Sequence, residues 1–299
     1  MRILITGSAG FIGQSLKIFL ANKGVEVISY DPKDDSQNSV LDLQNLKSKI
    51  KDADGVVHAA AMSQPKLTYE HPLDCVNINI GGTANVLEAL RQTQGKRPWM
   101  IFISSREVFG QAKILPITEK TPRQPVTVYG MTKAAGEDLC RIFSESYGLK
   151  TRILRFVSVY SGKNDKLERV IPRFIIESAK NEPLTIRGTG EEAFDFTYIG
   201  DICQGTWGSI QEVEKSQKLH DDFILSFGEP VSLKDLAQII IEETGSKSSI
   251  KYEQASSFSS VKCYADCRKA REILGFKPKV AIREGIKLVV QEFQEAGII

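Results

Sequence analysis

The sequence predicts an α/β fold in which helices cover both faces of a parallel sheet and a second, smaller lobe is attached. Short apolar runs of strand length alternate along the chain with longer segments whose apolar residues recur at helical spacing. Several of these runs lead directly into glycine, alanine or serine, as at residues 3–13, 56–61 and 101–105. Together these features favour a doubly wound sheet that binds ligands at the carboxyl ends of its strands.

Composition limits the classes of function. A chain of 299 residues with 41% hydrophobic and 25% charged residues is an ordinary globular protein with room for a large core. The balance of 39 basic and 37 acidic residues gives no reason to expect a nucleic-acid or membrane partner, and no signal peptide or membrane-spanning stretch is visible. Five scattered cysteines favour reduced thiols in the cytoplasm, and only three histidines argue against a metal site.

The first element is a strand, a glycine turn and a helix, with the turn at residues 6–13. Gly7 would permit the tight turn, and Gly10 would let a pyrophosphate approach the backbone. Gly13 would let the helix pack closely on the strand, with the phosphates at the helix N-terminus. This context predicts a dinucleotide site.

The second strand, residues 25–30, ends at Asp31. The spacing from the glycine turn suits an acid that binds the adenosine ribose hydroxyls, which favours NAD over its phosphorylated form. The alternative is that Asp31 caps a turn in the polar run 31–38.

The remaining elements continue the alternation. The strand at 56–61 contains His58, which we interpret as a packed residue, and runs into small side chains that leave room for a cofactor. The alternation predicts a Rossmann-type NAD-binding domain at residues 1–162, to which the chain returns at about 196–225. The substrate lobe is predicted to comprise 163–195 and 226–299. The other elements are a helical pattern at 72–94 broken at Gly81-Gly82, a strand at 101–105, a helix at 126–147 and a strand at 151–156.

Tyr129 and Lys133 lie one turn apart on the predicted helix 126–147 and therefore share a face. A free tyrosine has a pKa of about 10, so it needs help to act as a base near neutrality. A neighbouring ammonium and an oxidised nicotinamide ring would lower that pKa, and the phenol could then exchange a proton with a substrate hydroxyl. Ser104 and Ser105, at a strand end, could hydrogen-bond the same oxygen.

With these residues in place, the chain resembles the extended short-chain dehydrogenase/reductases, specifically the NAD-dependent sugar epimerase/dehydratase family. The resemblance covers nearly the whole length. The matching segments are 6–13, 58–61, 79–83, 104–110, 129–133, 195–201, 264–266, 269–270 and 274–276.

The resemblance implies roles for individual residues. It implies a catalytic set of Ser105, Tyr129 and Lys133, joined by Glu107, and a homodimer through the helices at 72–94 and 126–147. It also implies cofactor contacts from Gly7, Gly10, Phe11, Ile12, Gly13, Asp31, Asp42, Leu43, Ala59, Ala60, Ala61, Met62, Asn79, Ser104, Tyr129, Lys133 and Phe156. In this scheme Asp42 lies near the adenine, Asn79 supports the nicotinamide half and Phe156 packs against its ring.

Glu107 and Arg106 are the variable part of the site. Family dehydratases and decarboxylases carry a glutamate at the position of Glu107, where it acts on a sugar C–H or a leaving hydroxyl. Arg106 could bind a substrate carboxylate or phosphate. The alternative is that the two residues form a solvated ion pair at the edge of the cleft.

The substrate lobe departs from the family pattern. Ser158 stands where an Asn is usual, Phe194 stands where an Arg is common, and residues 256–260 lack a second Arg. Such arginines fork onto a diphosphate. Arg173 and Arg187 could compensate for them.

The sequence therefore predicts an NAD-dependent oxidoreductase/isomerase that moves a hydride between the nicotinamide and a carbon of a sugar, with Tyr129 as acid and base. The substrate is a small molecule, a sugar or nucleotide sugar. Epimerisation, elimination and simple reduction stay open. The alternatives are an NAD(P)H-dependent ketoreductase of a non-nucleotide small molecule and a non-catalytic cofactor-binding regulatory subunit.

Overall fold

The computed structural model describes residues 1–93, 98–254 and 262–299. Its centre is a parallel six-stranded sheet with the order β10-β5-β4-β3-β1-β2, which confirms the predicted fold class. The strands are β1 (Arg2–Thr6), β2 (Glu26–Tyr30), β3 (Gly55–His58), β4 (Trp99–Ser105), β5 (Thr151–Phe156) and β10 (His220–Leu225).

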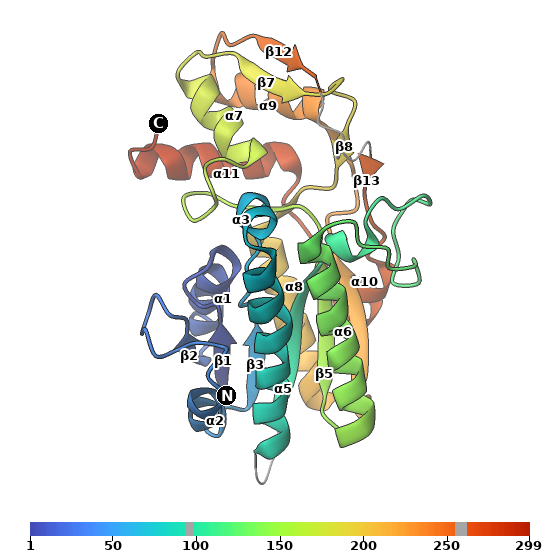
Figure 1. Cartoon of the computed structure of the whole chain (residues 1–299). Helices are drawn as coiled ribbons and strands as arrows, with labels where there is room; N and C mark the ends of the chain where they lie inside the picture. Colours follow the sequence, from blue (N-terminus) through green and yellow to red (C-terminus); the bar gives the residue numbers. More distant parts are fainter. Residues whose placement is uncertain (94–97, 255–261) are drawn as a thin grey trace.

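Two apolar cores lie on opposite faces of this sheet. Successive residues of β1 divide between them: Ile3 and Ile5 pack against α1, α8 and α10, whereas Leu4 packs on the side of α2, α5 and α6. The result is three layers, with α5 and α6 side by side on one face (Figure 1). The helices are α1 (Phe11–Ala21), α2 (Leu43–Ile50), α5 (Gly82–Gln92), α6 (Val128–Tyr147), α8 (Ile199–Lys215) and α10 (Arg268–Leu274).

The predicted helical pattern at 72–94 is interrupted earlier than expected. Short helices α3 (Pro65–Glu70) and α4 (Pro72–Val76) precede a π-helical turn, η1 (Asn77–Gly81), which runs into α5. The break therefore comes before Gly82, and it buries Asn79. Isolated π turns occur frequently at functional sites.

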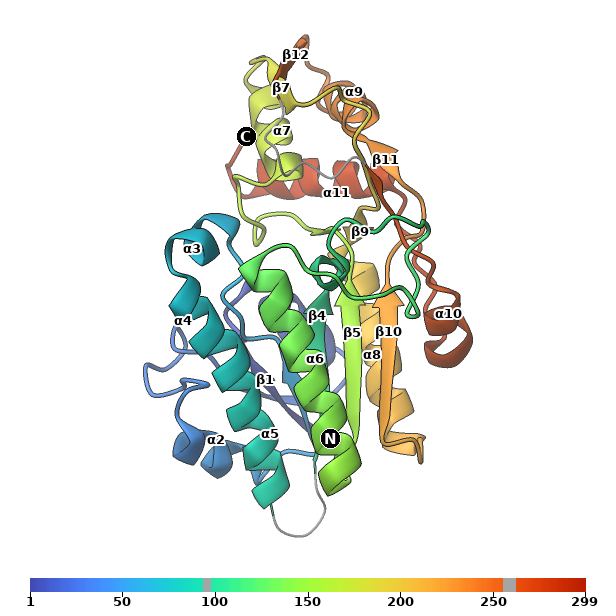
Figure 2. The same ribbon diagram turned by 45° about the vertical axis from the view of Figure 1, so that its right-hand side comes forward.

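A second lobe lies beyond the carboxyl ends of the strands (Figure 2). Its own core is formed mainly by α7 (Val170–Ala179), α9 (Leu233–Thr244) and α11 (Ile282–Glu295), with β7 (Leu184–Arg187) and β12 (Ile250–Glu253) as a two-stranded parallel sheet. Short strands join the two parts: β6 (Val159–Tyr160) with β9 (Thr197–Tyr198), and β11 (Val231–Ser232) with β8 (Ala193–Phe194) and β13 (Lys262–Cys263).

The tail does not lie wholly in this lobe. Helix α10 packs against α8, and Ala270, Leu274 and Phe276 belong to the core of the central sheet. The domain limits drawn from the sequence remain a prediction, and this packing divides segment 226–299 between the two parts.

Strand order brings the predicted functional segments together. β1 lies between β2 and β3, so the chain adds its second strand on one side of β1 and its third strand on the other. The glycine turn follows β1 and the alanine segment follows β3, which places both at the topological switch point where doubly wound sheets bind ligands.

Candidate active site

The glycine turn has a backbone that only glycine fits at two positions. Gly7 has a φ of +71°, and a Cβ there would lie 2.7 Å from the backbone nitrogen of Ala60. A Cβ on Gly13 would lie 2.1 Å from the carbonyl oxygen of Gly7. Gly10 is the N-cap of α1 and has an extended backbone. No side chain caps this helix end, so its first N–H groups stay free to bind a ligand. These features fit the pyrophosphate of a dinucleotide.

Asp31 follows β2 and turns toward this cradle. One oxygen of its carboxylate accepts a hydrogen bond from the Ala9 N–H at 3.3 Å, and the other accepts from the Lys33 N–H at 2.9 Å. The bond from Lys33 is the turn-capping contact given above as the alternative role of Asp31. The bond from Ala9 keeps the carboxylate beside the glycine turn. Asp42 caps α2 through the Asn45 N–H at 3.0 Å, and Leu43 begins that helix. Nucleotide contacts of these residues remain predictions.

The segment after β3, Ala59–Met62, is held by buried hydrogen bonds. The Asn79 amide accepts from the Met62 N–H at 2.8 Å and donates to the Met62 carbonyl at 3.1 Å and to the Thr132 hydroxyl at 2.9 Å. Asn79 therefore joins the alanine segment to α6, the helix that carries Tyr129 and Lys133.

His58 is a structural residue, as interpreted from the sequence. Its ring is fully buried, with Nδ1 2.7 Å from the Thr6 hydroxyl and Nε2 3.0 Å from the Thr83 hydroxyl. Burial, reinforced by Lys133, lowers its pKa to about 3, so the ring is neutral at physiological pH.

Ser105, Tyr129 and Lys133 meet at the carboxyl edge of the sheet. Ser105 ends β4 and pairs in register with Phe156, the last residue of β5. Tyr129 lies in the first turn of α6, which the Thr127 hydroxyl caps. The Lys133 ammonium is buried, lies 5.9 Å from the centre of the Tyr129 ring and donates to the Ile103 carbonyl at 2.7 Å.

The chain alone does not lower the pKa of Tyr129. Burial, followed by the Glu107 carboxylate, raises that pKa above its usual value, and hydrogen bonding with the Ser105 hydroxyl offsets this only in part. The lowering expected from Lys133 together with an oxidised nicotinamide ring stays a prediction; in the protein by itself the Lys133 ammonium donates to the Ile103 carbonyl. Burial also lowers the pKa of Lys133 to about 8.

Glu107 and Arg106 lie in the short 3₁₀ turn η2 (Arg106–Phe109) after Ser105. The Glu107 carboxylate accepts from the Thr127 hydroxyl at 3.1 Å and lies 3.9 Å from an Arg106 guanidinium nitrogen. Their side chains are 34% and 20% exposed, so the ion pair considered as the alternative is partly buried. Arg106 extends to the second lobe, where it lies over the Phe194 ring.

The two arginines considered as substitutes make their contacts within the second lobe. Arg173 donates to the Thr185 carbonyl at 3.0 Å, and Arg187 is 69% exposed and 3.9 Å from Glu253. Ser158 adopts a φ of +37°, a conformation unfavourable for most side chains. Residues 256–260 lie outside the part of the chain that the structure describes.

Sequence reasoning missed Arg169. Its guanidinium comes from the N-cap of α7, lies 5.6 Å from the centre of the Phe11 ring and pairs with Asp165 at 2.9 Å. Its charge offsets a small part of the burial-driven rise in the pKa of Tyr129. No local pattern marks it, because it reaches the glycine turn only through the packing of the lobe.

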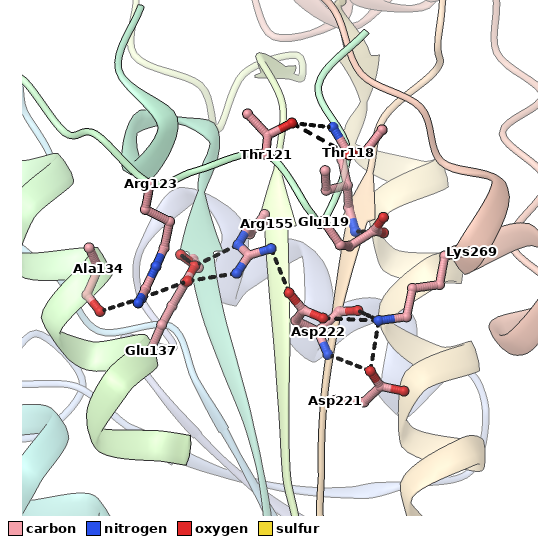
Figure 3. A network of polar contacts seen from close by, with 12 residues as sticks. Thr118, Glu119, Thr121, Arg123, Ala134, Glu137, Arg155, Asp221, Asp222 and Lys269 are labelled. Atoms are coloured by element: carbon pink, nitrogen blue, oxygen red, sulfur yellow. Dashed lines mark hydrogen bonds and ion pairs between the residues drawn. The ribbon is translucent and has the colours of Figure 1, made fainter. Parts of the chain in front are cut away.

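A buried ionic network below the site was also missed (Figure 3). Glu137, one turn beyond Lys133 on α6, accepts from the Ser104 hydroxyl at 2.6 Å and from Arg155 at 2.9 and 2.8 Å. Arg155 continues to Asp222 on β10 at 2.7 Å, and Asp222 accepts from Lys269 of α10 at 2.9 Å. The spacing of Glu137 from Lys133 was the only signal available in the sequence.

Residues 1–93, 98–254 and 262–299 contain neither a metal-binding cluster nor a membrane-spanning helix. No group of three or more His, Cys, Asp or Glu side chains there could hold a metal ion. No helix in these ranges is long and apolar enough to cross a membrane.

A Rossmann-type sheet with a dinucleotide cradle and a Ser, Tyr and Lys set at the same edge defines an NAD-dependent enzyme of the short-chain dehydrogenase/reductase type. The chain belongs to the NAD-dependent epimerase/dehydratase family, whose model matches residues 3–223. Its cofactor is NAD, and its chemistry is hydride transfer of the sugar epimerase/dehydratase type.

Several relatives match the chain from end to end. It is 28% identical to the UDP-glucuronate 4-epimerase of Thermodesulfobacterium geofontis, over 98% of this chain and 96% of that protein. The crystal structure of UDP-glucose 4-epimerase with UDP-glucose from Thermotoga maritima superimposes with a TM-score of 0.90 at 27% identity, covering 99% of both chains. The UDP-glucuronic acid 4-epimerase of Bacillus cereus, solved with UDP-glucuronic acid and NAD, gives 0.84 at 25% identity over 99% of this chain and 100% of that one.

Proposed function

We propose that this protein is a 4-epimerase of a UDP-linked hexose or hexuronic acid that keeps its NAD bound through the reaction cycle. The observation that carries the proposal is the meeting of Ser105 and Tyr129 at the sheet edge, with Lys133 beneath them, in a chain similar over its full length to UDP-sugar 4-epimerases. A hydride from the sugar C4 would pass to the nicotinamide and return to the opposite face of the sugar.

The residues of this chain would handle the proton and the geometry. In this proposal Ser105 holds the C4 oxygen, and Tyr129 takes its proton and later returns it. Because burial raises the pKa of Tyr129 in the protein itself, its phenolate requires the positive charges of Lys133 and the oxidised nicotinamide ring close by. The backbone cradle of Gly7, Gly10 and Gly13 would hold the pyrophosphate, and Asp31 the adenosine ribose.

Product analysis tests the proposal. Purified protein is incubated with UDP-glucose or with UDP-glucuronic acid, and the sugars are separated by chromatography while NADH absorbance is followed. We expect the C4 epimer with no net NADH, and a loss of about 10²- to 10⁴-fold in rate for Tyr129→Phe. Stoichiometric oxidation of added NADH when a keto sugar is supplied as substrate would instead identify a reductase. Equal turnover by Tyr129→Phe would contradict the role of Tyr129.

Elimination of water is the second candidate, and the position of Glu107 favours it. Its carboxylate is close enough to Tyr129 to raise the pKa of the phenol, so it could act on a C–H that a neighbouring ketone has acidified. A product lighter than its substrate by one water, absent with Glu107→Gln, would support the dehydratase function over the epimerase.

The proposal includes a homodimer formed through α5 and α6, which lie side by side on one face (Figure 1). Apolar side chains on α6 are exposed there: Met131 is 41%, Ile142 44% and Tyr147 44% accessible. We expect light scattering to give a dimer and Ile142→Glu to give a monomer, while Leu288→Glu on α11 leaves the dimer intact. A wild-type monomer at high concentration would contradict it.

We also propose that the protein works in the cytoplasm. All five cysteines are free and buried, which suits a reducing compartment. Fractionation of the native host should recover the protein with the cytoplasmic fraction, and recovery from a secreted fraction would contradict this.

A further inference from the structure

Arg106 is a guanidinium at the junction between the central sheet and the second lobe. Its backbone belongs to η2, directly after Ser105, while its side chain crosses to the three-stranded sheet of the lobe. There its charge lies 5.9 Å from the centre of the Phe194 ring on β8, and one nitrogen is 3.5 Å from the Cys263 sulfur on β13.

The polar contacts of this guanidinium are weak compared with those of the buried arginines Arg152 and Arg155. Arg155 makes three bonds of 2.7 to 2.9 Å to carboxylates, and Arg152 makes one of 2.5 Å and one of 3.1 Å to Glu212. Among the described residues, the polar contacts of the Arg106 side chain are with the Cys263 thiol and the Glu107 carboxylate, the latter at 3.9 Å. A guanidinium has five N–H donors, so most of its capacity is uncommitted.

The two neighbours leave most of the hydrogen-bonding capacity of this guanidinium open. Burial raises the pKa of the Cys263 thiol, which therefore remains uncharged. The Glu107 carboxylate pairs with the guanidinium by charge, but its nearer oxygen lies 3.9 Å away, beyond hydrogen-bond distance, and its other oxygen accepts from the Thr127 hydroxyl at 3.1 Å. The side chain of Arg106 is only 20% exposed, so its charge is partly desolvated and would interact strongly with an incoming anion.

The position of this charge relates it to the substrate. Arg106 is adjacent in sequence to Ser105, and its ion-pair partner Glu107 is close enough to Tyr129 to raise the pKa of the phenol. The guanidinium carbon lies 5.9 Å from the centre of the Phe194 ring, and a guanidinium presents its N–H groups as a planar fork that suits a two-pronged partner. Carboxylate and phosphate oxygens have that shape.

We propose that Arg106 is a specificity-determining residue that binds an oxyanion of the substrate across the junction of the two lobes. This inference rests on the proposed function for the identity of the substrate. The oxyanion is either the carboxylate of a uronic acid ring or the diphosphate of the nucleotide. Glu107 is its weak partner in the free protein, and the substrate anion takes the uncommitted donors.

Binding measurements on the NAD-loaded protein separate the two sources. Calorimetry is carried out with UDP, UDP-glucose and UDP-glucuronic acid on the wild type, Arg106→Gln, Arg106→Lys and the control Arg268→Gln. Arg268 is an exposed arginine that pairs with Asp266 at 2.6 Å. Arg268→Gln removes the same single positive charge as Arg106→Gln.

We expect Arg106→Gln to weaken binding by about 10- to 100-fold, the effect of one or two charge-assisted hydrogen bonds. If the sugar carboxylate is the partner, only UDP-glucuronic acid loses affinity; if the diphosphate is, all three ligands lose it together. Arg106→Lys keeps the charge without the fork and should fall between, while Arg268→Gln should stay within about twofold of the wild type.

The proposal is overturned if Arg106→Gln, with wild-type melting behaviour and NAD content, binds all three ligands as the wild type does. Product analysis of the same wild-type protein tests the epimerase function independently of the role of Arg106. A protein that binds these ligands through Arg106 and yields no C4 epimer would refute the epimerase function and keep the role of Arg106. Epimerisation of both UDP-sugars by Arg106→Gln at the wild-type rate and affinity would keep the epimerase function and refute the role of Arg106.

Discussion

The ionic network below the active site should contribute strongly to stability, and Glu137→Gln tests this. Glu137 is 2% exposed and accepts both Arg155 bonds and a 3.3 Å contact from Arg123 (Figure 3). It also accepts a bond from the Ser104 hydroxyl. A glutamine keeps the shape but removes the charge and turns an N–H donor toward other donors. The Arg155 side chain, 6% exposed, then lacks its nearest counter-charge.

The magnitude follows from this burial. Breaking a buried ion pair costs about 3–5 kcal/mol, and we expect the lower end, about 3 kcal/mol, because Arg155 keeps its contact with Asp222. The matched control is Glu145→Gln on the same helix. Glu145 also pairs with an arginine, Arg141, at 3.0 Å, but the two side chains are 61% and 47% exposed. Such a pair contributes about 0.5 kcal/mol or less.

Urea denaturation of both variants gives the two free energies of unfolding. We expect a difference of about 2–3 kcal/mol between them, and a partial recovery of stability when Glu137 and Arg155 are both replaced by leucine. Equal midpoints for Glu137→Gln and Glu145→Gln, at equal denaturant dependence, would refute the reasoning that burial gives this network its strength.

Other features give further expected outcomes. Burial raises the pKa of the fully buried Asp195 from 3.8 to about 6, against bonds from the Gly228 and Ala265 N–H groups. The folded protein therefore holds this proton more tightly than the unfolded chain, so stability from this group is lost as pH rises from about 4 to about 6, by up to about 3 kcal/mol. Asp195→Asn should flatten that part of the stability profile, and an unchanged slope would contradict the raised pKa. Gly13→Ala places a Cβ 2.1 Å from the Gly7 carbonyl oxygen, so it should lower the free energy of unfolding by at least about 1–3 kcal/mol and reduce the amount of bound NAD. In the control Gly81→Ala the nearest neighbour of the new Cβ is 3.8 Å away, and we expect almost no effect. Equal NAD content in the two variants would contradict the proposed cradle.

Much of the fold was readable from local patterns. Apolar runs and helical spacing predicted the strands at 101–105 and 151–156 and the helix ending at Tyr147, because burial on a sheet face or a helix face imposes a period on the sequence. The break near Gly81-Gly82 was placed too late, since the π turn lies at 77–81, where buried Asn79 bonds to Met62 and Thr132 from distant parts of the chain.

The sequence by itself determined the glycine turn, Asp31 after the second strand and the Tyr129–Lys133 spacing. Each of these depends on a few neighbouring residues whose backbone geometry is local. Only the tertiary structure decided where long charged side chains end: Lys133 at the Ile103 carbonyl, Glu137 on Arg155, and Arg106 across the lobe junction at Phe194. A flexible side chain is fixed by the partners that folding brings to it from distant parts of the chain, and a burial-dependent pKa such as that of Tyr129 is fixed by the same packing.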